Sequence, residues 1–377
     1  MTQTTKPSAQ VPAQPTAHTA ADALAADVMV EKVFASVLGG MEAVTIAIGD
    51  RLGYYRALDD TDMTSEELAS TTGCSERYTR EWLEQQAVCG YLVATSDGAS
   101  RERRYTLAPG TAETLARPGE LTTMAPLARM LAAAATQWTR IADGAASGAG
   151  LGWVEYGVDM REAQADVNAP PLRRLLPDKW LAAGLPDVHR RLDAGEQLKI
   201  ADVGCGAGWA SIGLASRFPN ATVDAYDVDP PTVDLARRNI DAAGLGDRVR
   251  VFDTDLGSHG PSADYDLVLA VECIHDMAHP VPVLAAMREM AGAEGAVLVV
   301  DEKVADEFTA PGDDVEKLMY GYSTLVCLPD TMSGNPDGAT GTVIRRSIME
   351  RYAREAGFGG AEVLPVEHDM FRFYRLS

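Results

Sequence analysis

The sequence is short of cysteine and of basic residues. It has five cysteines among 377 residues, and no CxxC pair or Cys/His cluster has the spacing of a zinc site. We therefore expect reduced, buried thiols, a cytoplasmic protein and no metal. Only 33 Lys and Arg stand against 55 Asp and Glu, a formal charge of −22. Such a chain repels phosphate backbones and anionic membranes, which argues against nucleic-acid and membrane partners.

Targeting signals and long apolar runs are also missing. The stretch 1–26 is rich in Thr, Ala, Pro and Gln and lacks the apolar core of a signal peptide, so we interpret 1–27 as a disordered tail. The most apolar later stretch, 124–135, contains Arg129 and is too short to span a bilayer. Neither a P-loop nor an HExxH motif occurs, which leaves P-loop and zincin chemistry without support.

The first ordered part of the chain has the pattern of a winged helix. Apolar residues recur at helical spacing, and Thr64 and Glu67 form a capping box that starts a second helix. A third helix follows, and then two β-prone runs, 91–95 and 103–107, on either side of a turn. This order predicts an α-rich winged-helix domain over 28–110.

From residue 196 onwards, β-rich runs alternate with helical stretches. The β-rich runs are 198–203, 221–226, 248–252, 265–271 and 296–300. This alternation predicts an α/β domain with a parallel sheet that is covered on both faces. Two further runs, 361–366 and 370–376, predict a C-terminal antiparallel hairpin at the sheet edge. Between the two domains, 111–195 is interpreted as helices and loops broken by prolines.

The strongest chemical signal follows the first predicted strand of this sheet. Gly204, Gly206 and Gly208 occupy alternate positions, so the backbone can pass close to a ligand without a Cβ collision. A dinucleotide fingerprint, GxGxxG, would need another glycine where this chain has Trp209 or Ser211. Tryptophan would obstruct a pyrophosphate, so the pattern does not fit NAD.

This segment resembles motif I of the class I S-adenosylmethionine-dependent methyltransferases, and the resemblance extends over about 198–376. It implies a Rossmann-like seven-stranded sheet and S-adenosylmethionine as the cofactor. Asp202, with the glycine loop, would place the methionine portion. Asp227 matches the family acid that binds both ribose hydroxyls, since a carboxylate accepts two hydrogen bonds at once. Asp255 and Leu256 match the segment that flanks adenine.

The acceptor side of the site is expected after the fourth predicted strand, at Glu272-Cys-Ile-His275-Asp276. The Asp/Asn-Pro-Pro-aromatic motif of enzymes that methylate amide or nucleobase nitrogens is absent there. The His-Asp pair instead resembles small-molecule O-methyltransferases, in which the matching histidine removes the acceptor proton. The resemblance makes His275 a candidate base whose imidazolium Asp276 or Glu272 would hold. Alternatively, His275 caps the next helix or packs in the crevice.

Other residues are assigned less firmly by the sequence. Glu302 matches a position that orients the histidine in some plant relatives, but a surface carboxylate fits equally well. Trp153, Tyr156 and Tyr322 are candidates for the wall of an acceptor pocket or for plain core. Small-molecule methyltransferases with a winged-helix start use that domain to dimerise and to roof the active site, so the resemblance implies a homodimer.

The function that this sequence supports is S-adenosylmethionine-dependent methylation of a small molecule, on oxygen in preference to carbon or nitrogen. The Ala- and Gly-rich composition is compatible with bacterial secondary metabolism. Two alternatives remain open: a methyltransferase fold redirected to cyclisation or another displacement on a natural product, and a winged-helix DNA-binding regulator. The predicted parts are a tail (1–27), a winged-helix dimerisation domain (28–110), a helical connector and lid (111–195) and a catalytic domain (196–377).

Overall fold

A computed structural model of the chain describes residues 20–258 and 264–377, with side chains from residue 24 onwards. Contacts divide the chain into two units, 1–43 and 44–377. The helix α1 (Ala20–Arg51) begins in the first unit. Its alanine-rich start is a strong helix former, so the expectation of a tail through residue 27 is too long. The rest of the expected tail, 1–19, lies outside the described residues.

The winged-helix expectation is confirmed. The elements in order are the end of α1, α2 (Tyr54–Ala57), α3 (Ser65–Thr72), α4 (Glu76–Val88), β1 (Leu92–Ala94) and β2 (Tyr105–Leu107). The two short strands pair antiparallel. The core of this region is aromatic, because the rings of Tyr54 and Tyr55 pack 4.8 and 5.1 Å from that of Trp82.

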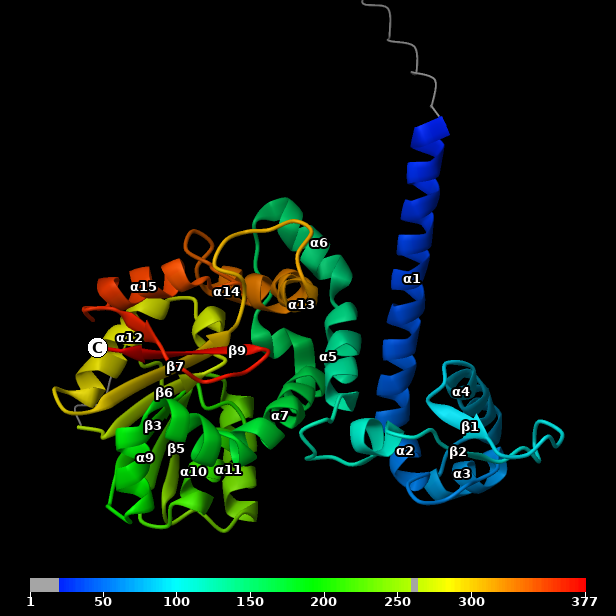
Figure 1. The fold of residues 1–377 in the computed structure, drawn as a ribbon, viewed down its shortest axis with the longest axis horizontal. Helices are drawn as coiled ribbons and strands as arrows, with labels where there is room; N and C mark the ends of the chain where they lie inside the picture. The colour runs from blue at the N-terminus through cyan, green and yellow to red at the C-terminus, as the bar shows by residue number, and fades with distance from the viewer. Residues whose placement is uncertain (1–19, 259–263) are drawn as a thin grey trace, which may run out of the picture. The chain divides into compact units, whose positions relative to one another are not determined.

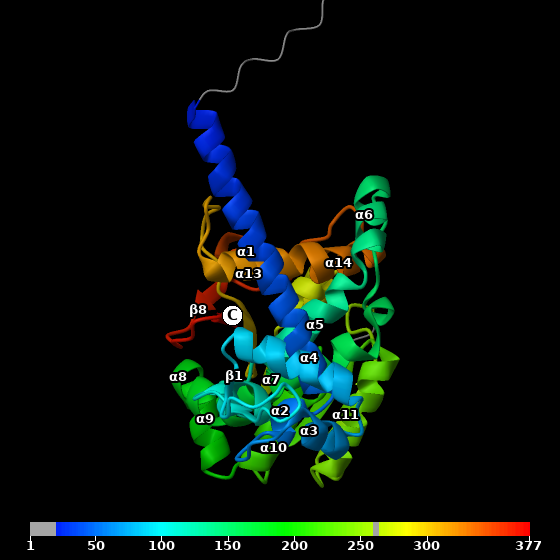
Figure 2. The same cartoon turned by 90° about the vertical axis from the view of Figure 1, so that its right-hand side faces the viewer.

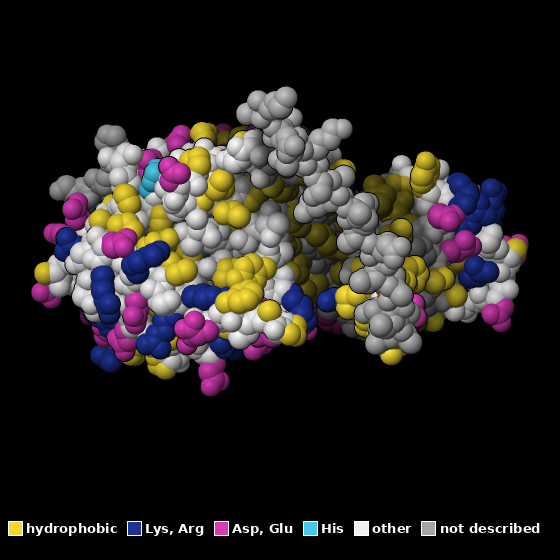
Figure 3. All heavy atoms as spheres, turned by 90° about the horizontal axis from the view of Figure 1, so that it is seen from above, with side chains coloured by type: hydrophobic (Ala, Val, Ile, Leu, Met, Phe, Trp, Pro, Cys, Tyr) yellow, Lys and Arg dark blue, Asp and Glu magenta, His cyan; other side chains and the backbone are white. Residues whose placement is uncertain are grey.

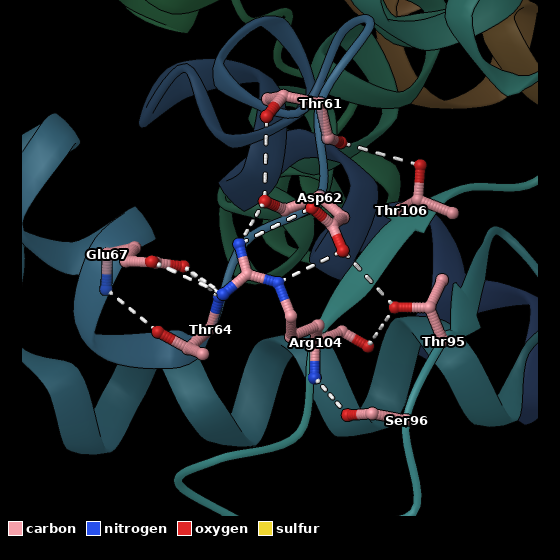
Figure 4. Close-up of polar contacts among 8 residues, drawn as sticks. All are labelled: Thr61, Asp62, Thr64, Glu67, Thr95, Ser96, Arg104 and Thr106. Atoms are coloured by element: carbon pink, nitrogen blue, oxygen red, sulfur yellow. Dashed lines mark hydrogen bonds and ion pairs between the residues drawn. The ribbon is translucent and has the colours of Figure 1, made fainter.

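A single arginine ties the second wing strand to the start of α3 (Figure 4). The Arg104 guanidinium pairs with the carboxylates of Asp62 and Glu67, each at 3.0 Å, and donates to the Asp62 carbonyl at 2.8 Å. Glu67 also accepts the backbone N–H of Thr64, which completes the predicted capping box. The wing is therefore held by charges that belong to the protein itself.

The connector is helical, as expected. Its elements are η1 (Ala112–Ala116), α5 (Ala125–Ala135), α6 (Trp138–Ser147), η2 (Trp153–Tyr156), α7 (Gly157–Arg174), η3 (Leu176–Trp180), α8 (Leu181–Gly184) and α9 (Pro186–Asp193). Pro170 and Pro171 lie inside α7, where each removes a helical N–H donor.

The C-terminal part contains a seven-stranded sheet in the order β5-β4-β3-β6-β7-β9-β8. Its strands are β3 (Lys199–Val203), β4 (Thr222–Asp227), β5 (Val249–Asp253), β6 (Leu267–Val271), β7 (Ala296–Glu302), β8 (Ala361–Val363) and β9 (Phe371–Leu376). The first five pair in parallel, whereas β9 is antiparallel to both β7 and β8. The predicted mixed sheet with a C-terminal hairpin is thus confirmed.

Helices cover both faces of this sheet (Figures 1 and 2). The helices α10 (Trp209–Arg217) and α11 (Pro230–Ala242) pack with α9 into one apolar core. On the other face, α12 (Pro280–Ala291) and α15 (Arg346–Glu355) pack into a second core. The remaining elements are η4 (Ile274–Asp276), α13 (Asp314–Tyr322), η5 (Ser323–Cys327) and α14 (Leu328–Gly334).

The strand order places a crevice at the carboxyl ends of β3 and β6. After β3 the chain builds β4 and β5 outward on one side, and it then returns to build β6 and β7 on the other. The connections that follow β3 and β6 therefore run in opposite directions. Ligands of open α/β sheets bind at such a switch point.

We expect Gly213→Ala in α10 to destabilise the protein by about 1–3 kcal/mol, because overpacking a fixed contact strains the backbone. An added Cβ would lie 2.5 Å from the Leu172 carbonyl oxygen and 3.0 Å from the Arg173 Cα of α7. The matched control is Gly321→Ala in α13, where a Cβ would meet nothing within 4 Å. The control should gain up to about 1 kcal/mol from helix propensity. Urea unfolding of both variants measures the difference, and equal effects would contradict the close contact.

Candidate active site

The glycine loop after β3 adopts a conformation that requires glycine. The φ angles of Gly204, Gly206 and Gly208 are 65°, 54° and 80°, all in the left-handed region. A Cβ added to Gly204 would lie 2.7 Å from the Cys273 Sγ, so this loop presses against the segment that follows β6. At Gly206 an added Cβ would meet nothing within 4 Å. The loop therefore closes the bottom of the crevice and is open above Gly206.

Asp227, at the end of β4, is joined to this loop. Its Oδ2 accepts the backbone N–H of Gly206 at 2.9 Å, and its Oδ1 accepts the N–H of Asp229 at 3.0 Å. Burial raises the pKa of the Asp227 carboxyl. The structure thus brings together the two features that the sequence assigned to the cofactor.

Asp202 lies deeper than its predicted role suggested. Its side chain is 2% exposed, and its Oδ2 accepts both the N–H (3.1 Å) and the hydroxyl (2.6 Å) of Ser211 on α10. Burial raises the pKa of Asp202 to about 6. Its carboxylate therefore fastens the end of β3 to α10, and the sequence had not identified Ser211 as its partner.

Asp255 and Leu256 follow β5 at the same edge of the sheet. Their segment is joined to Asp227 by the N–H of Thr254, which donates to the Asp227 carbonyl at 3.0 Å. Asp255 is exposed and accepts from its own turn, from the Gly257 N–H at 2.9 Å and the Ser258 hydroxyl at 2.6 Å. Leu256 is buried in the core.

His275, in η4, is enclosed by carboxylates. Its Nδ1 lies 2.7 Å from the Asp301 Oδ1 and 3.0 Å from the Glu302 Oε2, and its Nε2 lies 3.3 Å from the Asp276 Oδ1. The ring is 4% exposed. Glu302 is buried against the ring, so it is not the surface carboxylate that the sequence allowed. Asp301 was missed, although two successive acids at the end of an apolar strand were a visible signal.

This enclosure favours a protonated ring. Burial alone would lower the pKa of His275, but Asp276, Glu302 and Asp301 together raise it well above its usual value. Burial raises the pKa of Glu302 well above its usual value, whereas the charge of His275 lowers that of Asp301. These directions favour an imidazolium paired with the Asp301 carboxylate. A ring with carboxylates at both nitrogens is poorly placed to be the base that the sequence predicted.

Glu272 lies beside this enclosure and interacts electrostatically with His275, Asp276 and Asp301. The ion pairs of His275 are with Asp276, Asp301 and Glu302, and Glu272 interacts with the ring only through its charge, so a role of Glu272 in stabilising the imidazolium stays a prediction. Its carboxylate also hydrogen-bonds with Asn168 of α7, and burial raises its pKa to about 7.

The ligand-type atoms of His275, Asp301 and Glu302 lie within 4.8 Å of one another, a spacing that could hold a metal ion. The 2.7 Å contact between Nδ1 and Oδ1 is a normal hydrogen-bond length, so His275 and Asp301 bind each other directly, whereas the buried Asp301 Oδ2 and Glu302 Oε2 have no hydrogen-bond partner among the described residues. That the protein uses no metal stays a prediction.

Three aromatic candidates gather in one apolar cluster between the connector and the loop after β7. Trp153, Tyr156 and Tyr322 pack around the buried Cys327, whose thiol interacts with His275. The Tyr156 hydroxyl donates to the Leu325 carbonyl at 2.7 Å. These contacts join the connector to the segment that follows β7, near His275.

Comparison with protein families agrees with this architecture. Residues 201–297 match a methyltransferase domain, and residues 40–117 match the Rv2258c-like winged HTH domain. The chain therefore joins a winged helix-turn-helix domain to a methyltransferase domain. Both matches fall where the structure has the corresponding fold.

Curated relatives are similar over part of their length. The chain is 45% identical to the release factor glutamine methyltransferase of Chlorobaculum tepidum over 64 residues, which is 17% of this chain and 22% of that protein. It is 33% identical to methyltransferase GfsG of Streptomyces halstedii over 141 residues, 37% of this chain and 49% of that protein. The chain thus spans less than half the length of these relatives.

Solved structures share the fold over nearly the whole chain. An O-methyltransferase family protein from Burkholderia thailandensis has a TM-score of 0.68 at 18% identity, covering 93% of this chain and 97% of that one. Human N-acetylserotonin methyltransferase in complex with S-adenosylmethionine has a TM-score of 0.68 at 15% identity, covering 92% and 97%. The N,N-8-amino-8-demethyl-D-riboflavin dimethyltransferase of Streptomyces davawensis has a TM-score of 0.58 at 19% identity, covering 95% and 99%. At these low sequence identities, the structural similarity shows a common fold.

We expect His275→Ala to destabilise the protein by about 3–5 kcal/mol at neutral pH, because it leaves buried carboxylates without their counter-charge. This destabilisation should become smaller towards about pH 5, because protonating the buried carboxylates then costs less free energy. In the wild type, the raised pKa of His275 keeps its stabilisation complete below about pH 6.5, and it is lost only as the pH rises through the higher folded value.

Thermal unfolding at several pH values measures this effect. His279→Ala, which removes an exposed histidine from the same segment, is the control. A deficit in His275→Ala that does not change with pH would contradict the buried ion cluster.

Proposed function

We propose that this protein transfers a methyl group from S-adenosylmethionine to a small-molecule acceptor. The observation that carries the proposal is the hydrogen bond between the Asp227 carboxylate and the Gly206 N–H at the switch point of the sheet. It fixes an acid, suited to a ribose diol, beside a backbone bend that a ligand can approach closely.

The residues present fit this cofactor. The open space above Gly206 suits the nucleoside, Asp227 keeps further lone pairs for the ribose hydroxyls, and Asp255 with Leu256 lies at the edge expected for adenine. Asp202 would act indirectly, because it fastens the end of β3, where the glycine loop begins, to α10. When bound, the cofactor supplies a methyl group on a positively charged sulfur.

An oxygen acceptor is proposed ahead of nitrogen or carbon. The support is the His275-Asp276 pair, its likeness to small-molecule O-methyltransferases and the O-methyltransferase among the similar structures. The riboflavin-derivative dimethyltransferase shows that the same fold also serves nitrogen. The aromatic cluster of Trp153, Tyr156 and Tyr322 would wall the acceptor and exclude water, and secondary metabolism is the proposed setting.

A redirected enzyme that cyclises or otherwise displaces a group without methylation is the second candidate, because a cofactor pocket can persist when the reaction changes. Incubation with methyl-labelled S-adenosylmethionine and extracts that contain candidate acceptors separates the two. Label in a small-molecule product supports methylation, whereas an altered but unlabelled product supports redirection.

A DNA-binding role is disfavoured by the charges of the winged helix. Arg77 and Arg80 of α4 pair with Glu81 and Glu76, and Arg104 of the wing is bound within the domain. Figure 3 shows Lys and Arg interspersed with Asp and Glu over the face it presents. Arginines neutralised in this way release few counterions from a phosphate backbone, so we propose no nucleic-acid partner.

We propose instead that α1 packs against α1 of a second copy. Val30, Phe34 and Met41 lie on one stripe of the helix and are each more than 60% exposed. The segment Leu24–Arg51 is long and apolar enough to cross a membrane by length and composition alone. The charges at Glu31 and Lys32 within it, and the soluble fold of the similar structures, favour a cytoplasmic dimer.

Asp227→Ala should weaken S-adenosylmethionine binding by about 10- to 100-fold, because hydrogen bonds to a charged group contribute about 1.5–3 kcal/mol. Isothermal titration calorimetry measures the affinity. Asp241→Ala, which removes an exposed carboxylate from the end of α11, is the control for the change in net charge. Equal affinity in wild type and Asp227→Ala would refute the assignment.

The double variant Val30→Glu/Phe34→Glu should convert a dimer into a monomer, since it places charges in an apolar interface. Light scattering after size-exclusion chromatography gives the mass. Lys32→Glu changes the net charge by the same amount on the same helix and should stay dimeric. A monomeric wild type, or a wild type recovered with membranes, would contradict the proposed dimer.

A further inference from the structure

Glu272 has a backbone conformation that is costly for its side chain. Its φ is 52°, and among the described residues only Asp60 shares a positive φ without being glycine. Such a conformation costs about 1–3 kcal/mol and persists where the surrounding structure enforces it, often at functional sites. The backbone is enforced here, because the Glu272 N–H donates to the Val300 carbonyl at 2.8 Å and continues the sheet. Glycine at this position would relieve the strain, so the presence of a glutamate indicates that its carboxylate has a function.

The position of Glu272 in the sheet agrees with such a function. It directly follows β6 and directly precedes Cys273, whose side chain contacts the glycine loop. Glu272 therefore lies at the switch point, between the proposed cofactor loop and the His275 enclosure.

Charged and polar groups face Glu272 from three elements. They are His275 and Asp276 from η4, Asp301 from β7 and Asn168 from α7. The two acids and burial favour a protonated Glu272, whereas the imidazolium and the Asn168 hydrogen bond favour the carboxylate. The balance sets the pKa of Glu272 to about 7, so a single added charge can decide its state.

His275 is less able than Glu272 to change its protonation state. Its two ring nitrogens face the carboxyl groups of three acids at 2.7 to 3.3 Å, and proton loss would leave the ionised ones without a counter-charge. Glu272 is less enclosed than His275, being partly exposed. Glu272 is therefore better placed than His275 to meet an acceptor.

We propose that Glu272 is the proton acceptor of this site and that the positive charge of the bound methyl donor is what drives off its own proton. This inference rests on the proposed function. The donor's sulfonium would stabilise the nearby carboxylate, as any close cation does. The product S-adenosylhomocysteine has a neutral sulfur and lacks this effect, so Glu272 is more fully ionised with the methyl donor bound than with the product bound.

The proton and electron balance of the step is complete. The hydroxyl proton of the acceptor moves to a carboxylate oxygen of Glu272, while the oxygen's electron pair forms the bond to the methyl carbon. The carbon–sulfur bond breaks, and its electron pair remains on sulfur as a neutral thioether. The proton on Glu272 then leaves to solvent. The neighbouring groups act as positioning residues that keep the pKa of Glu272 near neutrality; they are His275, Asp276, Asp301 and Glu302.

Calorimetry with the cofactor alone tests this proposal without an identified acceptor. Titrating S-adenosylmethionine in buffers of different ionisation enthalpy counts the protons released on binding. The wild type should release a substantial fraction of one proton near pH 7 with S-adenosylmethionine and little with S-adenosylhomocysteine. Its affinity for S-adenosylmethionine should rise about three- to tenfold from about pH 6 to about pH 8, because binding displaces a proton.

The variants identify the group that releases the proton. Glu272→Gln should bind S-adenosylmethionine with little proton release and a flat pH dependence, whereas His275→Gln should still release it. Asn168→Ala removes a hydrogen bond that favours the carboxylate, so the pH midpoint should move upward. Glu289→Gln, an exposed acid of α12, should behave as the wild type.

The outcomes that overturn the proposal are distinct. Equal proton release with both ligands, or release that persists in Glu272→Gln and disappears in His275→Gln, would assign the proton to another group. If Glu272→Gln does not fold, an unmoved midpoint in Asn168→Ala overturns the proposal. Failure of both ligands to bind the wild type would instead refute the proposed function.

Discussion

The contact between the Asp227 carboxylate and the Gly206 N–H is the constraint on which the site depends. It joins the ends of the neighbouring parallel strands β3 and β4 on one side of the crevice, and it can form only because the loop after β3 accepts positive φ at three glycines. A side chain at Gly204 would also collide with Cys273 and push the segment after β6 away. The loop conformation therefore determines the distance between the cofactor side and the acceptor side of the crevice.

Asp202 and His275 show how the chain stabilises polar groups beneath that crevice. Each is nearly inaccessible to water, and each is satisfied by partners from a different element: Ser211 for Asp202, and Asp301 with Glu302 for His275. A buried ion cluster of this kind contributes little net stability compared with apolar packing. Its presence at the carboxyl edge of the sheet is better explained by the local field that it creates for chemistry.

Much of this arrangement follows from the sequence, because parallel strands bring their carboxyl ends to one edge. That rule, together with the resemblance to the methyltransferase family, placed Asp227, Asp255 and His275 at one edge of the sheet. The partners of buried groups could not be predicted in the same way. Ser211 and Asp301 are ordinary residues in their own segments, and only the packing of β3 on α10 and the pairing of β6 with β7 give them their roles.

Acidic residues, which predominate in the chain as a whole, also gather at the acceptor side of the site. Glu272, Asp276, Asp301 and Glu302 surround a single imidazolium, and the pKa of two of them is raised by burial. A site with this balance attracts a cationic donor and penalises an acceptor that carries a carboxylate or phosphate beside the reacting atom. A neutral hydroxyl or an amine satisfies it better, because either can donate a hydrogen bond to an ionised Glu272. The electrostatics of the protein thus favour an uncharged or basic acceptor before its shape is considered.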